Sequence, residues 1–136
     1  MTTKTPDEDE LLVKWEEVYK KGLLSFWILL RLHDGPGYAY DIARSIEGFS
    51  QSTMSADENS IYRALGRFES LGILASEVRE SDSGPDRRYY SLTERGRALL
   101  RRFIERNILV FEAPEVGKRI RIVLNGVPPK RRSERK

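Results

Sequence analysis

The chain has 136 residues, of which 39% are hydrophobic and 33% charged, so we expect one soluble globular domain with a modest core and polar tails. It contains no cysteine, which excludes disulfides and thiolate chemistry. No apolar run is long enough for a membrane span, and the N-terminus lacks the apolar stretch of a signal peptide. We therefore expect a cytoplasmic protein without a membrane partner. The scarcity of Asn and Gln beside many ion-pairing residues suggests a thermophilic source.

Charge is unevenly distributed along the chain, although the net charge is only +3. Residues 1–20 carry three basic against six acidic side chains, residues 21–86 carry six against ten, and residues 87–136 carry fifteen against five. A strong positive field is therefore expected only in the last third. If the chain binds nucleic acid, that third must supply most of the phosphate contacts.

Two helices are predicted before residue 34. The first, over 7–20, has an apolar stripe at helical spacing made of Leu11, Leu12, Trp15, Val18 and Tyr19. Its acids at 7–10 point in different directions around a helix, so they fit a solvated first turn better than a metal site. Residues 20–22 interrupt the stripe, and the segment 23–32, LLSFWILLRL, predicts a second, central helix that is covered on more than one side. His33 at its end suits the helix C-terminus better than a catalytic role.

The following segments have the order of a helix-turn-helix unit. Residues 34–37 read DGPG, which is a strong turn signal. A short helix is predicted over 38–47 and ended by Gly48, with three residues facing inward: Ile42, Ala43 and Ile46. Residues 49–56 form a polar loop, and a longer helix is predicted over 57–71.

The 57–71 helix has two contrasting faces. Its apolar face consists of Ile61, Leu65, Phe68 and Leu71, and its polar face carries Asn59, Ser60, Arg63, Arg67 and Ser70. Such a polar face suits a major groove, because Arg donates two hydrogen bonds to guanine and Asn pairs in the same way with adenine. An ordinary amphipathic surface helix is the alternative interpretation. Asp57 or Ser55 is expected to cap the helix N-terminus.

A β-hairpin is predicted directly after this helix. Residues 73–80 and 87–92 have strand character, and the sequence SDSGPD between them predicts a loop. A hairpin in this position is typical of a wing. Arg87 and Arg88 then lie where the second strand leaves the loop, within reach of backbone phosphates. A plain hairpin whose arginines serve solubility is the alternative.

The C-terminal third is predicted to be helical. Thr93 caps a helix over 94–111, whose apolar stripe comprises Leu99, Leu100, Phe103, Ile104 and Ile108. Pro114 ends it. For the segment up to residue 127 we favour a further helix, because Pro114 and Asn125-Gly126 act as start and stop signals, although Ile120, Ile122 and Val123 favour a strand.

Residues 21–100 resemble the PadR family of winged helix-turn-helix regulators. The matching segments are 27–30 (WILL) with Gly35-Pro36, 39–42 (AYDI), 61–65 (IYRAL), 68–69 (FE) with 72–74 (GIL), 87–90 (RRYY) and 92–96 (LTERG). The chain departs from the family at Ala39, Arg63 and Phe68, where Gly, often Pro, and Leu are usual. The resemblance implies a homodimeric transcription regulator, usually a repressor, in which the tyrosines matching Tyr40 and Tyr62 lie close to the DNA backbone.

In this family a C-terminal helical region makes the dimer, whereas here that region is short and the 7–20 helix is additional. We therefore expect both to share the dimer interface, through Leu12, Trp15, Tyr19 and Phe103. The fold class expected is mainly α with a small β-hairpin. The domains expected are a dimerisation helix (1–20), a winged helix-turn-helix domain (21–92), a C-terminal dimerisation region (93–127) and a disordered basic tail (128–136).

The leading hypothesis is a dimeric regulator that binds a pseudo-palindromic operator in double-stranded DNA. The candidate DNA-binding residues are Tyr40, Ser55, Asn59, Ser60, Tyr62, Arg63, Arg67, Arg87 and Arg88. The alternative is a winged-helix module that binds another protein, which the acidic middle of the chain favours.

An enzyme is disfavoured, because the chain has one His and none of the motifs HExxH, GxGxxG and P-loop, and we expect no cofactor or metal. A small aromatic effector is a further hypothesis, since some relatives bind flat aromatic compounds against tryptophans in the dimer cavity. Trp15 and Trp27 are the candidate effector site, and two ordinary core tryptophans are the alternative.

Overall fold

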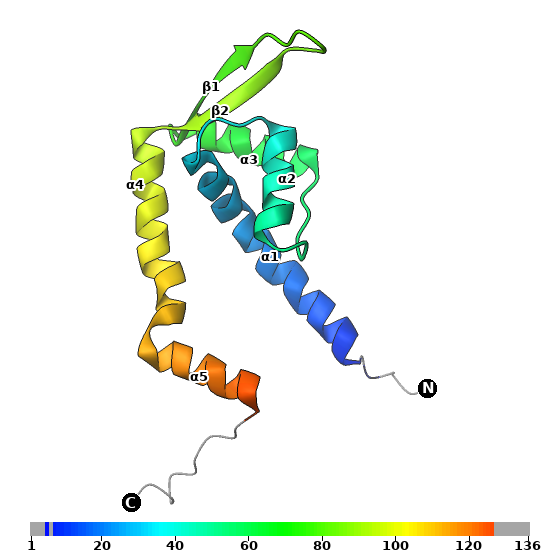
Figure 1. Ribbon diagram of the computed structural model, residues 1–136, viewed down its shortest axis with the longest axis vertical. Helices are drawn as coiled ribbons and strands as arrows, with labels where there is room; N and C mark the ends of the chain where they lie inside the picture. The colour runs from blue at the N-terminus through cyan, green and yellow to red at the C-terminus, as the bar shows by residue number, and fades with distance from the viewer. Residues whose placement is uncertain (1–4, 6, 127–136) are drawn as a thin grey trace, which may run out of the picture. The chain divides into compact units, whose positions relative to one another are not determined.

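The computed structural model describes residue 5 and residues 7–126, and they form a mainly helical winged helix-turn-helix fold with one small hairpin (Figure 1). The elements are α1 (Glu8–His33), α2 (Ala39–Phe49), α3 (Glu58–Ser70), β1 (Leu74–Arg79), β2 (Arg87–Leu92), α4 (Glu94–Phe103), the π-helical η1 (Ile104–Ile108), the 3-10 helix η2 (Leu109–Glu112) and α5 (Pro114–Asn125). The described part of the chain forms two compact units, a first unit that ends at Leu100 and a second that begins at Arg101.

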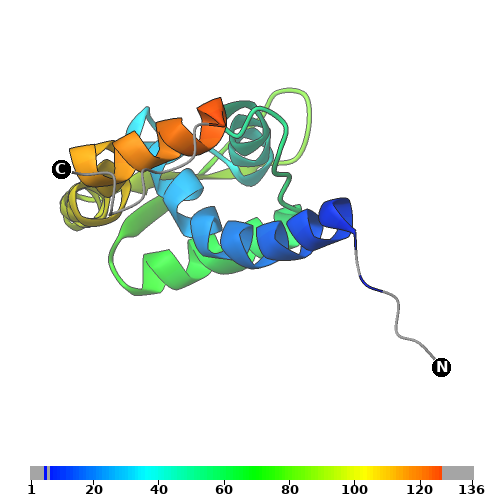
Figure 2. The same cartoon turned by 90° about the horizontal axis from the view of Figure 1, so that it is seen from below.

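The first helix, α1, is continuous over 26 residues, so the expectation of two separate helices was wrong (Figure 2). Lysine is a good helix former, and a single glycine costs only about 1 kcal/mol in a helix interior. The free energy that Gly22 costs the helix is therefore outweighed by the burial of Ile28, Leu29 and Leu32 on the same helix. The predicted ends are confirmed, because the Asp7 carboxylate accepts the Glu10 N–H at 2.8 Å and the helix stops at His33.

The core of the first unit lies where α2 contacts both α1 and α3 and where the hairpin contacts α1 and α3. Its buried hydrophobic residues are Ile28, Leu29, Leu32, Ala39, Ile42, Ile46, Ile61, Ala64, Leu65, Phe68, Ile73, Leu74, Tyr90, Leu92 and Leu100. Leu71, expected on the buried face, is instead 55% exposed. The reason is that α3 ends at Ser70, and Gly72, with φ +77°, turns the chain toward β1.

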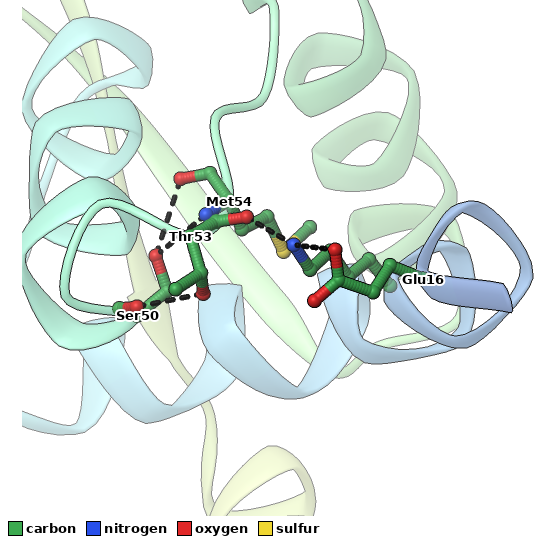
Figure 3. A network of polar contacts seen from close by, with 5 residues as sticks. Glu16, Ser50, Thr53 and Met54 are labelled. Carbon is green, nitrogen blue, oxygen red and sulfur yellow. Dashed lines mark hydrogen bonds and ion pairs between the residues drawn. The ribbon is translucent and has the colours of Figure 1, made fainter. Parts of the chain in front are cut away.

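The helix α2 extends through Gly48 to Phe49, one residue past its predicted stop, and Gln51 and Ser52 make the turn with positive φ. Figure 3 shows how the next residues are held. The Ser50 hydroxyl accepts the Met54 N–H at 3.1 Å, and the Thr53 hydroxyl donates to the Ser50 carbonyl at 2.7 Å. Lys20 of α1 donates to the Thr53 carbonyl, so α1 fixes the loop that leads into α3.

The hairpin has the predicted position, and its strands pair in register from Leu74 opposite Leu92 to Arg79 opposite Arg87. Side chains alternate between two faces along each strand. We call the face with the buried Leu74, Tyr90 and Leu92 the inner face, and the opposite one the outer face. An interaction that the sequence did not indicate joins Gly37 to Tyr90 by two backbone hydrogen bonds of 3.1 and 2.8 Å, and it ties the turn before α2 to β2.

The helix predicted over 94–111 is only partly confirmed. Thr93 caps α4 through the Gly96 N–H at 3.0 Å, but the backbone turns π-helical after Phe103 and then 3-10. The helix favoured for the last segment is confirmed as α5, with Pro114 in its first turn and Gly126 in the left-handed conformation after its end. The predicted tail, 128–136, lies outside the described residues. No helix in the described part of the chain is both long and apolar enough to cross a bilayer.

Candidate nucleic-acid interface

The polar face of α3 is on the outside of the first unit. Ile61, Leu65 and Phe68 are buried on one side of the helix, and the opposite side exposes Asn59, Tyr62, Arg63, Arg67 and Ser70. We refer to these five exposed side chains as the α3 front. The sequence predicted this distribution except at three residues. Leu71 is exposed, Ser60 is half-buried in the helix cap, and Tyr62 belongs to the exposed face.

A short chain of hydrogen bonds organises the beginning of α3. The Asp57 carboxylate accepts the Ser60 N–H at 2.8 Å and the Ser60 hydroxyl at 3.0 Å. These two bonds hold the pKa of Asp57 below its ordinary value, the backbone N–H contributing most. The Ser60 oxygen in turn accepts from the Arg63 guanidinium at 3.2 Å. Ser60 is half-buried in this cap, and its bond to Arg63 orients that guanidinium along the helix.

Three tyrosines and three arginines form a second surface beside α3, in which Tyr38 and Tyr89 are half-buried and the other four side chains are exposed. It runs from the outer face of the hairpin onto α2, and we call it the arginine–tyrosine row; its members are Tyr38, Tyr40, Arg44, Arg79, Arg87 and Tyr89. The Arg79 guanidinium lies 4.3 Å from the Tyr89 ring centre, and the Tyr89 ring lies 5.3 Å from that of Tyr38. Such short cation–π distances fix the guanidinium groups without removing their charge.

The row continues across Tyr38. The Arg87 guanidinium lies 4.7 Å from the Tyr38 ring centre, and Tyr40 stacks on Tyr38 at 6.3 Å. Arg44, one helical turn after Tyr40, donates to the Tyr40 hydroxyl at 3.3 Å. Guanidinium groups and tyrosine rings are thus held in one continuous surface, which can offer N–H and O–H donors to anionic oxygens.

Positive charge is concentrated at the distal end of the outer face. Arg79 and Arg87 lie directly opposite each other in the register, an arrangement that is unfavourable for two like charges. Arg79 forms an ion pair with Glu77 at 3.0 Å. Among the described residues no carboxylate forms an ion pair with Arg87, so this guanidinium can neutralise an anion from outside the chain.

A hollow of ≈ 440 Å³ connects the two surfaces. It is lined by Tyr38, Tyr40, Glu58, Tyr62, Pro85, Asp86, Arg87 and Arg88. Four of the predicted DNA-binding residues are therefore brought together here. Two carboxylates, Glu58 and Asp86, also border the hollow and oppose an anion there.

Two predicted residues are placed differently from the rest. Ser55 is not on the α3 front but lines another hollow, of ≈ 300 Å³, next to Glu17 and Lys21 of α1. Arg88 also borders the hollow beside α3, but it lies on the inner face of the hairpin, where it donates to the Ser76 hydroxyl at 3.0 Å. The two adjacent arginines, Arg87 and Arg88, thus share the edge of one hollow but have different side-chain partners.

The candidate dimerisation residues on α1 are uncovered in the single chain. Leu12 and Tyr19 are exposed, and Trp15 is 74% exposed. Phe103, at the end of α4, is 38% exposed. A stripe of this kind along half a helix is more apolar surface than a soluble chain usually leaves to water.

The two tryptophans proposed as an effector site are not brought together within one chain. They are twelve positions apart on α1, which corresponds to about 18 Å of helix rise. Trp27 is half-buried, lies 6.1 Å from Phe49, and lines a hollow of ≈ 270 Å³ together with Tyr19 and Met54. Among the described residues, no group of three or more His, Asp or Glu side chains is arranged to hold a metal ion.

Sequence reasoning missed Tyr38, Arg44, Arg79 and Tyr89. Arg44 could have been found from its spacing of four residues after Tyr40, which places both side chains on the same side of a helix. Arg79 could have been found by pairing the two predicted strands outward from the SDSGPD loop, which sets it opposite Arg87. Tyr38 joins the row through its contact with Tyr89, far away in the sequence, and no local pattern indicates that contact.

The chain is similar to known regulators of transcription. The sequence model of the transcriptional regulator PadR-like family matches residues 28–102. A PadR family transcriptional regulator from Eggerthella lenta is 26% identical, with a TM-score of 0.66 over 82% of this chain and 94% of that one. A transcriptional regulator from Clostridium thermocellum is 25% identical, with a TM-score of 0.60 over 70% of this chain and 92% of that one.

Bacillus subtilis PadR in complex with operator DNA is 23% identical, with a TM-score of 0.56 over 60% of this chain and 46% of that one, a likeness that concerns the fold. No curated protein matches the sequence.

Proposed function

The chain belongs to the PadR-like family of transcriptional regulators, whose sequence model covers more than half of it, and we propose that it acts as a dimeric, sequence-specific repressor. Each subunit lays α3 in a major groove and its hairpin along the adjacent backbone or minor groove. Family and structural relatives are regulators rather than enzymes. The fold shared with Bacillus subtilis PadR, which was solved with operator DNA, supports this arrangement.

One observation carries the proposal: the α3 front and the arginine–tyrosine row are both exposed, and the hollow between them is lined from both sides. Arg63, Arg67 and Asn59 can read base edges, because their side chains match guanine and adenine in the major groove. The arginines and tyrosine hydroxyls of the row can bind phosphate oxygens, which fixes the register of the protein on the duplex. Tyr40 and Tyr62 border the hollow where the backbone would pass.

We assign dimerisation to the exposed apolar stripe of α1, with Leu12, Trp15 and Tyr19, and to the C-terminal region, with Phe103. Residues 21–92 then form the DNA-binding domain and residues 128–136 a basic tail. Because α1 is continuous, the boundary near residue 20 separates two functions of one helix rather than two folded parts. A symmetric pair of subunits would recognise two inverted half-sites.

Salt dependence of binding to random duplex DNA tests the DNA-binding assignment. We expect the logarithm of affinity to fall steeply and linearly with the logarithm of salt concentration, because counterions are released from the phosphates. Selection from a random library should then enrich an inverted repeat. Absence of duplex binding at low salt would refute the proposal.

A protein-binding winged helix is the second candidate, and the carboxylates of Glu58 and Asp86 beside the hollow favour it. A basic protein segment would be attracted to these acids, whereas DNA would be repelled by them. The variant Glu58→Gln separates the two functions. It should strengthen binding to DNA and weaken binding to a basic protein partner.

A small aromatic effector remains part of the proposal, with Trp27 and the hollow between α1 and residues 49–54 as its site in each subunit. Titration of the Trp15→Phe variant with planar aromatic dyes isolates the fluorescence of Trp27. Quenching that saturates supports the site, and unchanged fluorescence at high dye concentration assigns Trp27 to the core.

A further inference from the structure

A chain of three side chains links the inner face of the hairpin to α3. Arg88 of β2 donates to the Ser76 hydroxyl of β1 at 3.0 Å, and that hydroxyl donates to the Glu69 carboxylate of α3 at 2.6 Å. We call Glu69, Ser76 and Arg88 the hairpin relay. Both bonds involve an ionised group, and such bonds are stronger than those between neutral partners. The serine is needed by both ends, because it accepts from one charged group and donates to the other.

The relay lies where apolar support for the hairpin ends. Leu74, Leu92 and Tyr90 are buried at its base, whereas Val78, opposite Arg88, is 55% exposed. Two-stranded ribbons are only marginally stable without such support. Besides the contacts of Arg87 and Tyr89 with the Tyr38 ring on the outer face, the distal rung, which carries Arg79 and Arg87, therefore depends on polar contacts for its orientation.

We propose that Glu69, Ser76 and Arg88 are positioning residues that hold the distal hairpin against α3, so that Arg87 on the outer face meets a DNA phosphate. This inference rests on the DNA-binding function proposed above. It gives the two adjacent arginines separate roles: Arg87 contacts phosphate, and Arg88 acts through the hairpin. The burial of Tyr90, together with the nearby Glu69 carboxylate, raises the pKa of the Tyr90 hydroxyl.

The opposing view is that Arg88 itself binds phosphate. Ser76→Ala distinguishes the two, because the variant changes no charge. If Arg88 binds phosphate, losing Ser76 leaves it free to do so, and affinity stays the same or rises. If Arg88 is a positioning residue, losing Ser76 releases the hairpin, and affinity falls.

The first measurement is amide hydrogen exchange of the free protein. Ser76→Ala and Glu69→Gln should each accelerate exchange at 77–79 and 87–89 about five-fold, which corresponds to one net hydrogen bond, while α3 keeps its protection. Ser76→Thr, which retains the hydroxyl, should behave like the wild type. Ser91→Ala, which removes a serine hydroxyl from the outer face, is the matched control and should leave exchange at these positions unchanged. Unchanged exchange in Ser76→Ala overturns the inference.

The second measurement is a double-mutant cycle on duplex DNA. Arg87→Ala should weaken binding about five-fold and reduce the salt slope by about one. Ser76→Ala should do nearly the same, although it carries no charge change, and the double variant should be no weaker than Arg87→Ala alone. A residue needed only for folding would not show this coupling to Arg87.

Three outcomes of the binding measurements would also overturn the inference. Unchanged or tighter DNA binding by Ser76→Ala would mean that Arg88 itself contacts phosphate. If the loss of affinity in the double variant equals the product of the two single losses, Ser76 and Arg87 act independently. Failure of the wild type to bind duplex DNA removes the proposed function and this inference with it. In the first two cases the wild type still binds DNA, so loss of the relay and loss of the proposed function are distinguishable.

Discussion

Arg87 and Arg88 are neighbours in the sequence, but they face opposite sides of the hairpin. Strand alternation sets Arg87 over the Tyr38 ring and Arg88 beside Ser76. The sequence predicts both as one basic pair next to a loop, because their separate partners lie far away along the chain. In contrast, the capping role of Asp57 is local and could be predicted from the sequence alone.

At Arg63, truncation tests whether the α3 front reads bases. We predict that Arg63→Ala loses about 1–3 kcal/mol of binding free energy on the selected operator and relaxes base preference at one position. Arg97→Ala, an exposed arginine of α4, is the control for loss of charge. Fluorescence anisotropy with cognate and random duplexes measures both effects. Equal losses on the two duplexes would mean that Arg63 contacts phosphate.

At Asp57, the cap predicts a pH dependence of stability. The Ser60 N–H and hydroxyl lower the pKa of this carboxyl below its ordinary value of 3.8. A lowered folded-state pKa means that the stabilisation is present above pH 3.8 and is lost as the pH falls through the folded-state pKa. The variant Asp57→Asn keeps the acceptor oxygen without the titration. Urea unfolding from about pH 5 to about pH 2.5 should therefore show a shallower decline for the variant than for the wild type.

Among the elements, α1 shows how sequence periodicity can mislead. A break in the apolar stripe at 20–22 predicts two helices, yet helix continuity depends on backbone hydrogen bonds, which Lys and a single Gly allow. Lys20 has a second role, since it holds the loop before α3 through the Thr53 carbonyl. The hairpin and α5 could be predicted because their turn and stop residues are local. The π-helical turn at η1 has no such signal.

Two glycines in helices should respond oppositely to the same substitution. A Cβ on Gly66 of α3 would meet nothing within 4 Å, so Gly66→Ala should stabilise the protein by up to about 1 kcal/mol through helix propensity. A Cβ on Gly96 of α4 would lie 2.2 Å from the Ile73 carbonyl oxygen. Gly96→Ala should therefore destabilise the protein by about 1–3 kcal/mol. Urea unfolding at fixed protein concentration gives both values, and changes of the same sign would contradict the account.

For the whole molecule, the sequence predicts an apolar stripe on α1 but not what covers it. A single chain leaves Leu12, Trp15 and Tyr19 exposed, and in the dimer proposed above a second chain would cover them. The charge distribution along the sequence likewise does not predict which basic residues meet in the folded chain. Excess positive charge follows residue 86, yet the arginine–tyrosine row also recruits Arg44 and Arg79 from the acidic middle.

Polar substitutions on the α1 stripe test the dimer. We predict that Leu12→Gln combined with Trp15→Gln yields a monomer, because both side chains lose the apolar burial that drives association. Light scattering during size-exclusion chromatography measures the mass, and Lys14→Gln on the same helix is the control. The double variant should retain helical circular dichroism, since neither side chain belongs to the core. A dimer that persists would move the interface elsewhere.

The most direct test of the account varies the spacing of two inverted half-sites in a selected operator. Two α3 fronts in one dimer should require a centre-to-centre distance of about 34 Å, one helical turn of DNA, or a multiple of it. An insertion of about 5 base pairs, half a turn, should then abolish high-affinity binding, and about 10 base pairs should restore much of it if the dimer can span two turns. Affinity that is independent of spacing, or a single half-site bound as tightly as the pair, would contradict the account.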